Sequence, residues 1–247
     1  MKQPLSADLP FADGYVLPID KPLGWTSSDV VRKIKVMMRR LGLRTVKVGH
    51  AGTLDPLATG ILIVCIGRAT KQAEALQARP KEYVTTLVLG ATTPSYDMEH
   101  PVDRTYPYGH ITREMVEEAL RGMEGEQMQL PPVYSAKLID GKRAYDYARK
   151  GKEVEMRPAP VHIYSIGLEE FELPRITLRV RCSKGTYIRS LARDLGQKLG
   201  SGAYLSALRR TCNGDFTLDD VYTLDEIGEI LPGNRTETPV PESRSKG

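Results

Sequence analysis

The pattern of apolar and polar positions along the 247-residue chain predicts short strands and helices in mixed order, without an internal repeat. Residues 15–19 form a strand candidate that runs into a turn rich in Pro and Gly at 20–24. A helix is expected to follow, capped by Thr26, Ser27 or Ser28. Its apolar stripe is formed, at helical spacing, by Val30, Val31, Ile34, Met37, Met38 and Leu41.

Four further segments have the patterns of strands. Residues 61–66 are an apolar run suited to a buried strand, and residues 81–89 alternate between two faces. Residues 161–173 and 175–182 predict two strands joined by a tight turn at a Pro. In the last strand, apolar residues alternate with Arg and Thr, so one face is expected to be core and the other strongly basic.

Helical spacing recurs at 112–121 and at 186–199, where Gly200 ends the pattern, and a short helix is expected to begin near Ala69. Strands and helices do not alternate regularly along the chain. This order favours the α+β class, with a mixed, largely antiparallel central sheet flanked by helices.

The ends and one internal stretch differ in composition from the rest. Residues 1–13 predict a flexible arm, residues 14–230 one domain, and residues 231–247 a disordered tail rich in Pro, Ser, Thr and charge. Residues 129–157 are rich in Pro, Gly, Tyr and Lys and predict a basic insertion, with a short helix at 144–149.

The net charge is +4 and the sequence pI is about 8.9, which is only mildly basic. The distribution of the charged residues along the chain is more informative than this sum. Residues 32–47 contain seven basic residues and no acid, and residues 175–198 contain seven against one acid. Residues 213–229 contain six acids and no base. Such segregation predicts a cationic side that attracts phosphate backbones. Solvated helix faces are the alternative explanation for each cluster taken alone.

Metal, disulfide and membrane chemistry find no support in the sequence. The three cysteines are far apart and form no C-x-x-C, so neither a zinc site nor a disulfide framework is expected. Cys65 lies in an apolar run and is expected to be a thiol in the core. The N-terminus lacks the pattern of a signal peptide, and no apolar stretch approaches the ~18 residues of a membrane span. We therefore expect a cytoplasmic protein.

One loop combines many small residues with a carboxylate. The stretch from Gly49 to Gly60 contains Asp55, which stands before Pro56 and just ahead of the predicted buried strand. Rigid placement at a strand end suits a catalytic group. An aspartate that caps its own turn fits the same residues, and local chemistry alone favours that alternative.

The same stretch, with Gly67 to Lys71 after it, resembles the signature of the TruB-type tRNA pseudouridine synthases. Further segments resemble family motifs in the expected order, so that the match runs from about residue 14 to 230. These segments are residues 20–27, 81–83, 130–137, 182–190 and 208–210.

The resemblance implies the pseudouridine synthase fold and assigns catalytic roles to three residues. Asp55 is the carboxylate that acts on the uridine, and Arg189 keeps it ionised and in position. Tyr83 stacks on the extruded uracil, with its hydroxyl close to the C5 proton. In isolation, Tyr83 is an ordinary strand tyrosine and Arg189 a surface arginine of a helix.

Other positions are implied to bind substrate. His50 contacts the rearranged T-loop, Asp97 anchors Arg189, Tyr187 lines the site, and Leu208 packs under the uracil. Without the motifs, these residues are more often turn, loop or core positions. Residues 129–157 correspond to the family's RNA-gripping thumb loop. The candidates for contact with the RNA backbone are Lys21, Lys71, Lys137, Lys142 and Arg143.

The implied reaction converts the T-loop uridine (tRNA position 55) into pseudouridine after the nucleotide has been flipped out. It is an isomerisation that requires no metal, ATP or redox cofactor, and the sequence contains no P-loop motif. Attack on C6, attack on C1′ and a glycal route remain open. Larger members carry a PUA-type domain after the catalytic domain, and too few residues follow Ile230 for one here, so we expect a compact, monomeric form.

Two other functions fit the same residues less well. A non-catalytic RNA-binding protein or tRNA-folding chaperone would use the basic faces without the chemistry. The second alternative is the same isomerisation at a site in another RNA, either a guide-dependent site or one in messenger RNA. A glycosidase with a carboxylate pair is weaker still, because Asp55 has no acidic partner nearby in the sequence.

Overall fold

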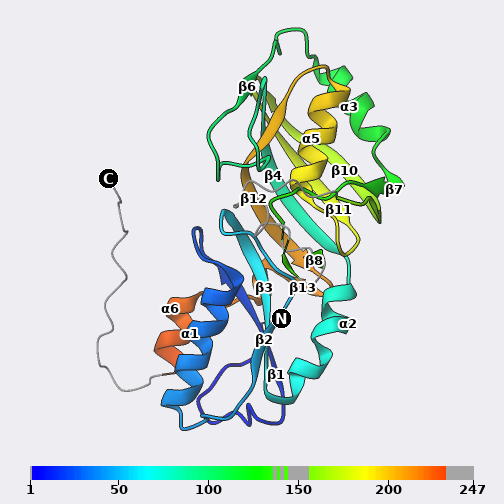
Figure 1. The fold of residues 1–247 in the computed structure, drawn as a ribbon. Coiled ribbons are helices and arrows are strands. Elements are labelled where there is room, and N and C mark those ends of the chain that lie inside the picture. Colours follow the sequence, from blue (N-terminus) through cyan, green and yellow to red (C-terminus); the bar gives the residue numbers. More distant parts are fainter. Residues whose placement is uncertain (1, 136–137, 140–141, 144–155, 232–247) are drawn as a thin grey trace.

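The computed structural model describes residues 2–135, 138–139, 142–143 and 156–231 and shows one large sheet with helices packed on it (Figure 1). The strands of this sheet are β1 (Tyr15–Lys21), β2 (Val48–Ala51), β3 (Ala58–Ile66), β4 (Lys81–Leu89), β7 (Gly125–Gln129), β10 (Ala159–Glu172), β11 (Arg175–Cys182), β12 (Ala203–Asn213) and β13 (Phe216–Thr217). The helices are α1 (Ser27–Arg40), α2 (Ala73–Ala78), α3 (Arg113–Arg121), α5 (Ile188–Lys198) and α6 (Leu224–Ile230), with the 3₁₀ turns η1 (Gly67–Gln72) and η2 (Leu218–Asp220). Two further pairs of short strands lie outside the large sheet, β5 (Ala91–Thr92) with β6 (Arg104–Thr105), and β8 (Leu138–Ile139) with β9 (Lys142–Arg143).

The strand order is β1-β3-β12-β4-β11-β10-β7, with β2 paired to β3 and β13 to β12. Every pairing is antiparallel except that of β12 with β3, which is parallel. The prediction of a mixed, largely antiparallel sheet is therefore confirmed. The sequence did not predict β12, although this strand joins the two halves of the sheet.

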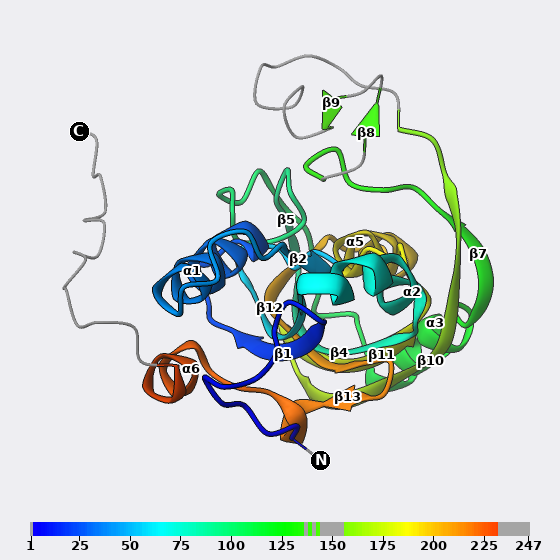
Figure 2. The same cartoon turned by 90° about the horizontal axis from the view of Figure 1, so that it is seen from below.

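Strand β3 is apolar on both faces because helices cover both. Leu62, Val64 and Ile66 belong to the main core, to which α1 contributes its predicted stripe. Ile61 and Ile63 belong to a second core under α2. Figure 2 shows α1 and α2 on opposite sides of β2. A strand that is buried on both faces does not alternate between apolar and polar residues, which explains the unbroken apolar run in β3.

The other half of the sheet has one covered face. In β4 and β11 the residues alternate between buried and partly or fully exposed, as the sequence predicts. Helix α5 packs on β12, and α3 packs on β10 beside it (Figure 1). Leu191 and Leu195 of α5 join Leu178 and Val180 of β11 in the main core.

The N-terminal segment corrects one prediction. Residues 1–13 lack periodicity and therefore predict a loose arm, whereas the described part packs onto the domain. Phe11 is buried in the main core, and Leu5 and Leu9 pack against it. The Tyr222 hydroxyl donates to the Gln3 carbonyl at 2.8 Å. A few irregularly spaced apolar side chains are enough to dock the segment without any regular structure.

Part of the predicted insertion and tail lies outside the described residues. The predicted helix at 144–149 and the tail from residue 232 are among these residues. The described helices include none long and apolar enough to cross a membrane.

The parallel pairing of β3 with β12 depends on a glycine at position 60. Gly60 has a φ of +93°, and a Cβ built there would lie 2.2 Å from the Arg210 carbonyl oxygen. We predict that Gly60→Ala lowers the free energy of unfolding by about 2–4 kcal/mol, from backbone strain and overpacking together. Urea denaturation measures this loss.

The matched control is Gly49→Ala on the adjacent strand β2, where a Cβ meets nothing within 4 Å. This variant is expected to unfold within about 0.5 kcal/mol of the unaltered protein. Equal stability of the two variants would contradict the steric requirement at Gly60.

Candidate active site

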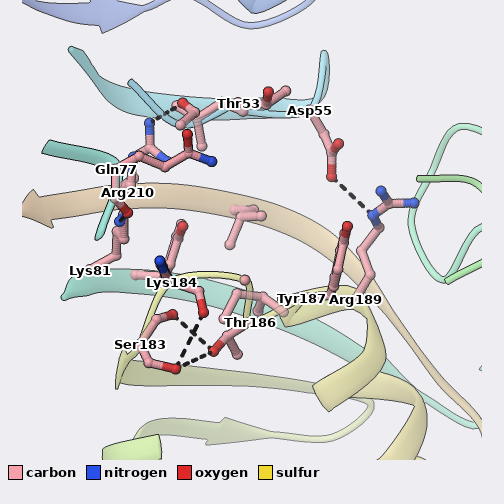
Figure 3. A pocket seen from close by; sticks show the side chains of 16 residues that line it. Thr53, Asp55, Gln77, Lys81, Ser183, Lys184, Thr186, Tyr187, Arg189 and Arg210 are labelled. Carbon is pink, nitrogen blue, oxygen red and sulfur yellow. Dashed lines mark hydrogen bonds and ion pairs between the residues drawn. The ribbon is translucent and has the colours of Figure 1, made fainter. Parts of the chain in front are cut away.

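A cavity of about 300 Å³ opens where the loop between β2 and β3 faces the start of α5 (Figure 3). Its walls come from four parts of the chain that are distant in sequence. Gly52 to Asp55 form one wall, and residues 183–189 form the opposite wall. Strands β4 and β12 supply Tyr83 and Leu208. The pairing of the sheet thus assembles a site from motifs far apart in the chain.

Asp55 and Arg189 meet across this cavity. Arg189 Nε lies 2.9 Å from Asp55 Oδ2, and the carboxylate retains 38% side-chain exposure while the arginine retains 5%. The buried guanidinium is held from behind, because Nη1 donates to the Ser95 carbonyl at 3.2 Å and Nε lies 3.6 Å from Asp97 Oδ2. A cation fixed in this way holds the carboxylate in one direction.

Asp97 is itself oriented by its own turn. Its Oδ1 accepts from the Ser95 hydroxyl at 2.6 Å and from the Glu99 backbone N–H at 2.9 Å. The carboxylate is almost completely buried, so these bonds and Arg189 replace its hydration. This geometry is the one that an anchoring role for Asp97 requires.

Tyr83 lines the cavity from β4 and is 8% exposed. Burial raises the pKa of its phenol above the ordinary value of 10.0, and the neighbouring Arg210 only partly offsets this shift. The phenol is therefore neutral at physiological pH and can donate or accept a hydrogen bond. An aromatic face with one polar tip suits a base that stacks while its edge is handled chemically.

Tyr187 and Leu208 complete the wall near Asp55. Tyr187 precedes α5, and its backbone is clamped by Gln129: the Tyr187 N–H donates to Gln129 Oε1 at 2.8 Å, and Gln129 Nε2 donates to the Tyr187 carbonyl at 3.1 Å. Burial raises the pKa of the Tyr187 phenol as well. Leu208, on β12, lines both this cavity and an apolar hollow on the other side of Arg189.

Two buried cations of the cavity were not predicted. Arg210 is 1% exposed; its Nε donates to the Ile61 carbonyl at 2.6 Å and its Nη2 to the Gly52 carbonyl at 3.1 Å. Lys81 donates to the carbonyls of Gln77 and Arg79, and burial, aided by Arg210, lowers its pKa to about 8. The sequence signal for Arg210 was the motif at 208–210, whose role becomes visible only once β12 is known to be a central strand.

The charge of the cavity is strongly positive. Among its lining residues Asp55 is the single acid, against the four cations Lys81, Lys184, Arg189 and Arg210. Such a balance suits a substrate that carries phosphates. A glycosidase needs two carboxylates that flank the substrate, and Asp97, the other carboxylate beside Arg189, is buried and does not line the cavity. The described residues contain no group of three or more His, Cys, Asp or Glu that could hold a metal ion.

The remaining predicted contacts are spread more widely. His50 lies on β2, partly buried, and is not among the residues that line the cavity. Lys71 is exposed on η1. Lys142 and Arg143 form the short strand β9, while Lys137 lies outside the described residues.

Lys21 corrects a prediction, because it cannot contact RNA. Its side chain is completely buried, and its ammonium donates to the carbonyls of Pro22, Trp25 and Pro56 at 2.9, 2.6 and 3.2 Å. Burial lowers its pKa to about 8, an effect that the nearby charge of Asp55 partly offsets. Lys21 therefore ties the turn after β1 to the residue that follows Asp55.

Comparison with protein families assigns the chain. The model described as "TruB family pseudouridylate synthase (N terminal domain)" matches residues 39–188, more than half of the chain. The chain belongs to the TruB family. The model described as "tRNA pseudouridylate synthase B C-terminal domain" matches residues 189–238, so the boundary between the two models falls at Arg189. This member of the TruB family is a tRNA pseudouridine synthase, an isomerase.

Similar proteins support the family over nearly the whole chain. A tRNA pseudouridine synthase B of Phocaeicola vulgatus is 54% identical over 94% of this chain and 99% of its own length. That of Bacteroides fragilis is 58% identical over 90% and 95%. A chain in the crystal structure of a Cbf5-Nop10-Gar1 complex superposes with a TM-score of 0.67 at 31% identity, over 90% of this chain and 55% of that chain.

We predict that Lys21→Met lowers the free energy of unfolding by about 1–3 kcal/mol, because three partly buried carbonyls lose a charged donor. The midpoint of urea unfolding reports the change. Lys71→Met is the matched control, since the same substitution at an exposed lysine should shift stability by less than about 0.5 kcal/mol. A Lys21→Met protein as stable as the control would show that the three contacts contribute nothing net.

Proposed function

We propose that this TruB-family enzyme converts the T-loop uridine of tRNA (position 55) into pseudouridine, with Asp55 as the carboxylate that acts on the nucleotide. The observation that carries the proposal is the pair formed by Asp55 and the buried Arg189 in a cationic cavity. The pair leaves the carboxylate partly exposed and aimed into the space where a nucleotide would lie (Figure 3).

The chemistry asked of this cavity is an isomerisation. The N1–C1′ glycosidic bond breaks, the uracil turns within the site, and a C5–C1′ bond forms. The proton on C5 leaves, and N1 gains one from solvent or a protein group, so atoms and electrons balance without a co-reactant. One carboxylate placed near C1′ and C6 serves attack on either carbon, or removal of a sugar proton.

The other lining residues fit the demands of these steps. The buried ring of Tyr83 offers a stacking face for the detached uracil, which must not diffuse away between bond breakage and rejoining. Its neutral hydroxyl suits transfer of the C5 proton. The cations of the cavity suit the phosphates on either side of the flipped nucleotide.

The choice of tRNA as the substrate rests on the degree of similarity. The bacterial proteins named tRNA pseudouridine synthase B are 54% and 58% identical to this chain, against 31% for the chain of the Cbf5-Nop10-Gar1 complex. A purely RNA-binding role would leave unexplained why a carboxylate faces a buried arginine at the centre of the cavity.

We predict that Asp55→Asn abolishes release of tritium from T-arm RNA labelled at uracil C5, while RNA binding changes little. The amide keeps the size of the side chain but removes its charge and nucleophilicity. Asp219→Asn, an exposed aspartate of η2, is the matched control and should release tritium at the unaltered rate.

The outcomes separate the alternatives. Release that survives Asp55→Asn would exclude the carboxylate mechanism. An unaltered protein that binds T-arm RNA but releases no tritium would favour the chaperone function. Equal release from an RNA with a scrambled T-loop would contradict the substrate assignment.

We predict that Tyr83→Phe lowers the single-turnover rate about 10²–10⁴-fold at saturating RNA, the usual contribution of one proton-transferring group. The ring remains, so the dissociation constant should stay nearly constant. Tyr204→Phe removes a hydroxyl from a partly buried tyrosine of β12 outside the cavity and serves as the control. A Tyr83→Phe enzyme with an unchanged rate would limit Tyr83 to stacking.

A further inference from the structure

The positive charge of the molecule is neutralised unevenly. Of the seven cations in residues 175–198, three have an acidic partner among the described residues, and Arg175, Arg181, Lys184 and Lys198 have none within ion-pair distance. The ion pairs of this segment are Arg179 with Glu82 and Glu169, Arg189 with Asp55, and Arg193 with Asp194.

The other basic segment, residues 32–47, keeps its charge. Among the described residues only one of its seven cations has an acidic partner, Arg32 with Asp29. The other six side chains are exposed and have no acidic side chain of the described chain within ion-pair distance. These six are Lys33, Lys35, Arg39, Arg40, Arg44 and Lys47.

Four of these cations surround a groove of about 430 Å³ between α1 and β2. Lys35 and Arg39 extend into it from the second half of α1, and Arg44 and Lys47 from the connection that follows. The lining contains no acidic, aromatic or amide side chain. A surface of this composition suits the phosphate groups of a nucleic-acid backbone.

The groove and the active-site cavity are lined by residues that lie close together along the chain. Its lining includes Gly49 on β2, and the same strand runs on into the catalytic loop, where Gly52 already lines the cavity. Three extended residues span about 10 Å. His50, for which the sequence implies contact with RNA, lies between the two. Helix α1 packs beside β2 (Figure 1), which brings the cations of the helix next to the strand that leads into the catalytic loop.

We infer that this groove, hereafter the α1–β2 groove, is a second RNA-binding site that holds backbone phosphates of the substrate outside the nucleotide in the cavity. The inference rests on the proposed function in that the partner is RNA. The groove contributes affinity and orientation, whereas the cavity carries out the chemistry. Its contribution is electrostatic and therefore independent of the sequence of the bound segment.

The test compares two double variants of one helix. Lys35→Gln with Arg39→Gln removes two cations of the groove, and Lys33→Gln with Arg40→Gln removes two exposed cations from another side of α1. At 100° per residue, positions 35 and 39 lie about 40° apart, and positions 33 and 40 lie at least about 100° from both. The two variants therefore match in charge, residue type and exposure.

The groove variant is expected to weaken binding of a T-arm RNA about 10-fold at moderate salt. Its slope of log affinity against log salt should fall by about 1.4–1.8, since each lost phosphate contact removes about 0.7–0.9. The control variant should change affinity by less than about 3-fold. The single-turnover rate at saturating RNA should remain that of the unaltered protein in both. Arg44→Gln with Lys47→Gln, outside the helix, should reproduce the effect of the groove variant.

Equal weakening by the groove and control variants would overturn the inference, because it would indicate a diffuse field instead of a site. A groove variant whose affinity and salt slope match those of the unaltered protein would also overturn it. Should the unaltered protein fail to isomerise T-arm RNA, the proposed function falls, yet the contrast in salt slope between the two variants still decides whether the groove binds RNA.

Neutral methylphosphonates placed singly along the RNA locate the contact. One position is expected to weaken binding by the unaltered protein and by the control variant, but not by the groove variant. This non-additivity identifies the phosphate that occupies the groove. Additive losses at every position would contradict a defined contact.

Discussion

The parallel pairing of β3 with β12 is the constraint on which the site depends. It sets Gly60 beside Arg210 at a backbone approach that excludes any larger side chain. On one side of this junction the chain leads back to Asp55, and on the other side β4 presents Tyr83. Strands that are 150 residues apart in the chain thereby bring the carboxylate and the aromatic ring to one cavity.

Buried cations reinforce the same junction by binding backbone carbonyls. Arg210 binds Gly52 at the start of the catalytic loop and Ile61 on β3 after it, and Lys21 binds Pro56 inside the loop. Desolvating a charge is unfavourable unless several acceptors surround it, as they do here. Charged side chains from β1 and β12 therefore help to fix the shape of the loop.

Much of the fold could be predicted because the spacing of apolar residues shows which face of a helix or strand is buried. Helix α1 and strands β4, β10 and β11 have clear patterns, since each has a defined apolar face or stripe. Strand β12 escaped prediction because its buried positions include Arg210, and its register with β4 is interrupted twice by bulges. A charged residue in a central strand violates the pattern that sequence analysis relies on.

The candidate site could be predicted only in part, for a related reason. The motifs named Asp55, Tyr83, Tyr187, Arg189 and Leu208, and the structure brings all five to one cavity. Lys21 was misread, because a lysine beside Pro and Gly looks exposed in any local view. The carbonyls that it binds come together only after Pro56 returns to the turn following β1.

Gln129 anchors the start of the insertion to the sheet and to the active site. It is the cross-strand partner of Ala159, and its amide clamps the backbone of Tyr187 in both directions. The chain thus leaves the sheet and returns to it at paired positions. A loop with joined ends can change length at a cost that grows only with the logarithm of its size. The length of the segment between Gln129 and Ala159 can therefore change at little cost while the clamp on Tyr187 is kept.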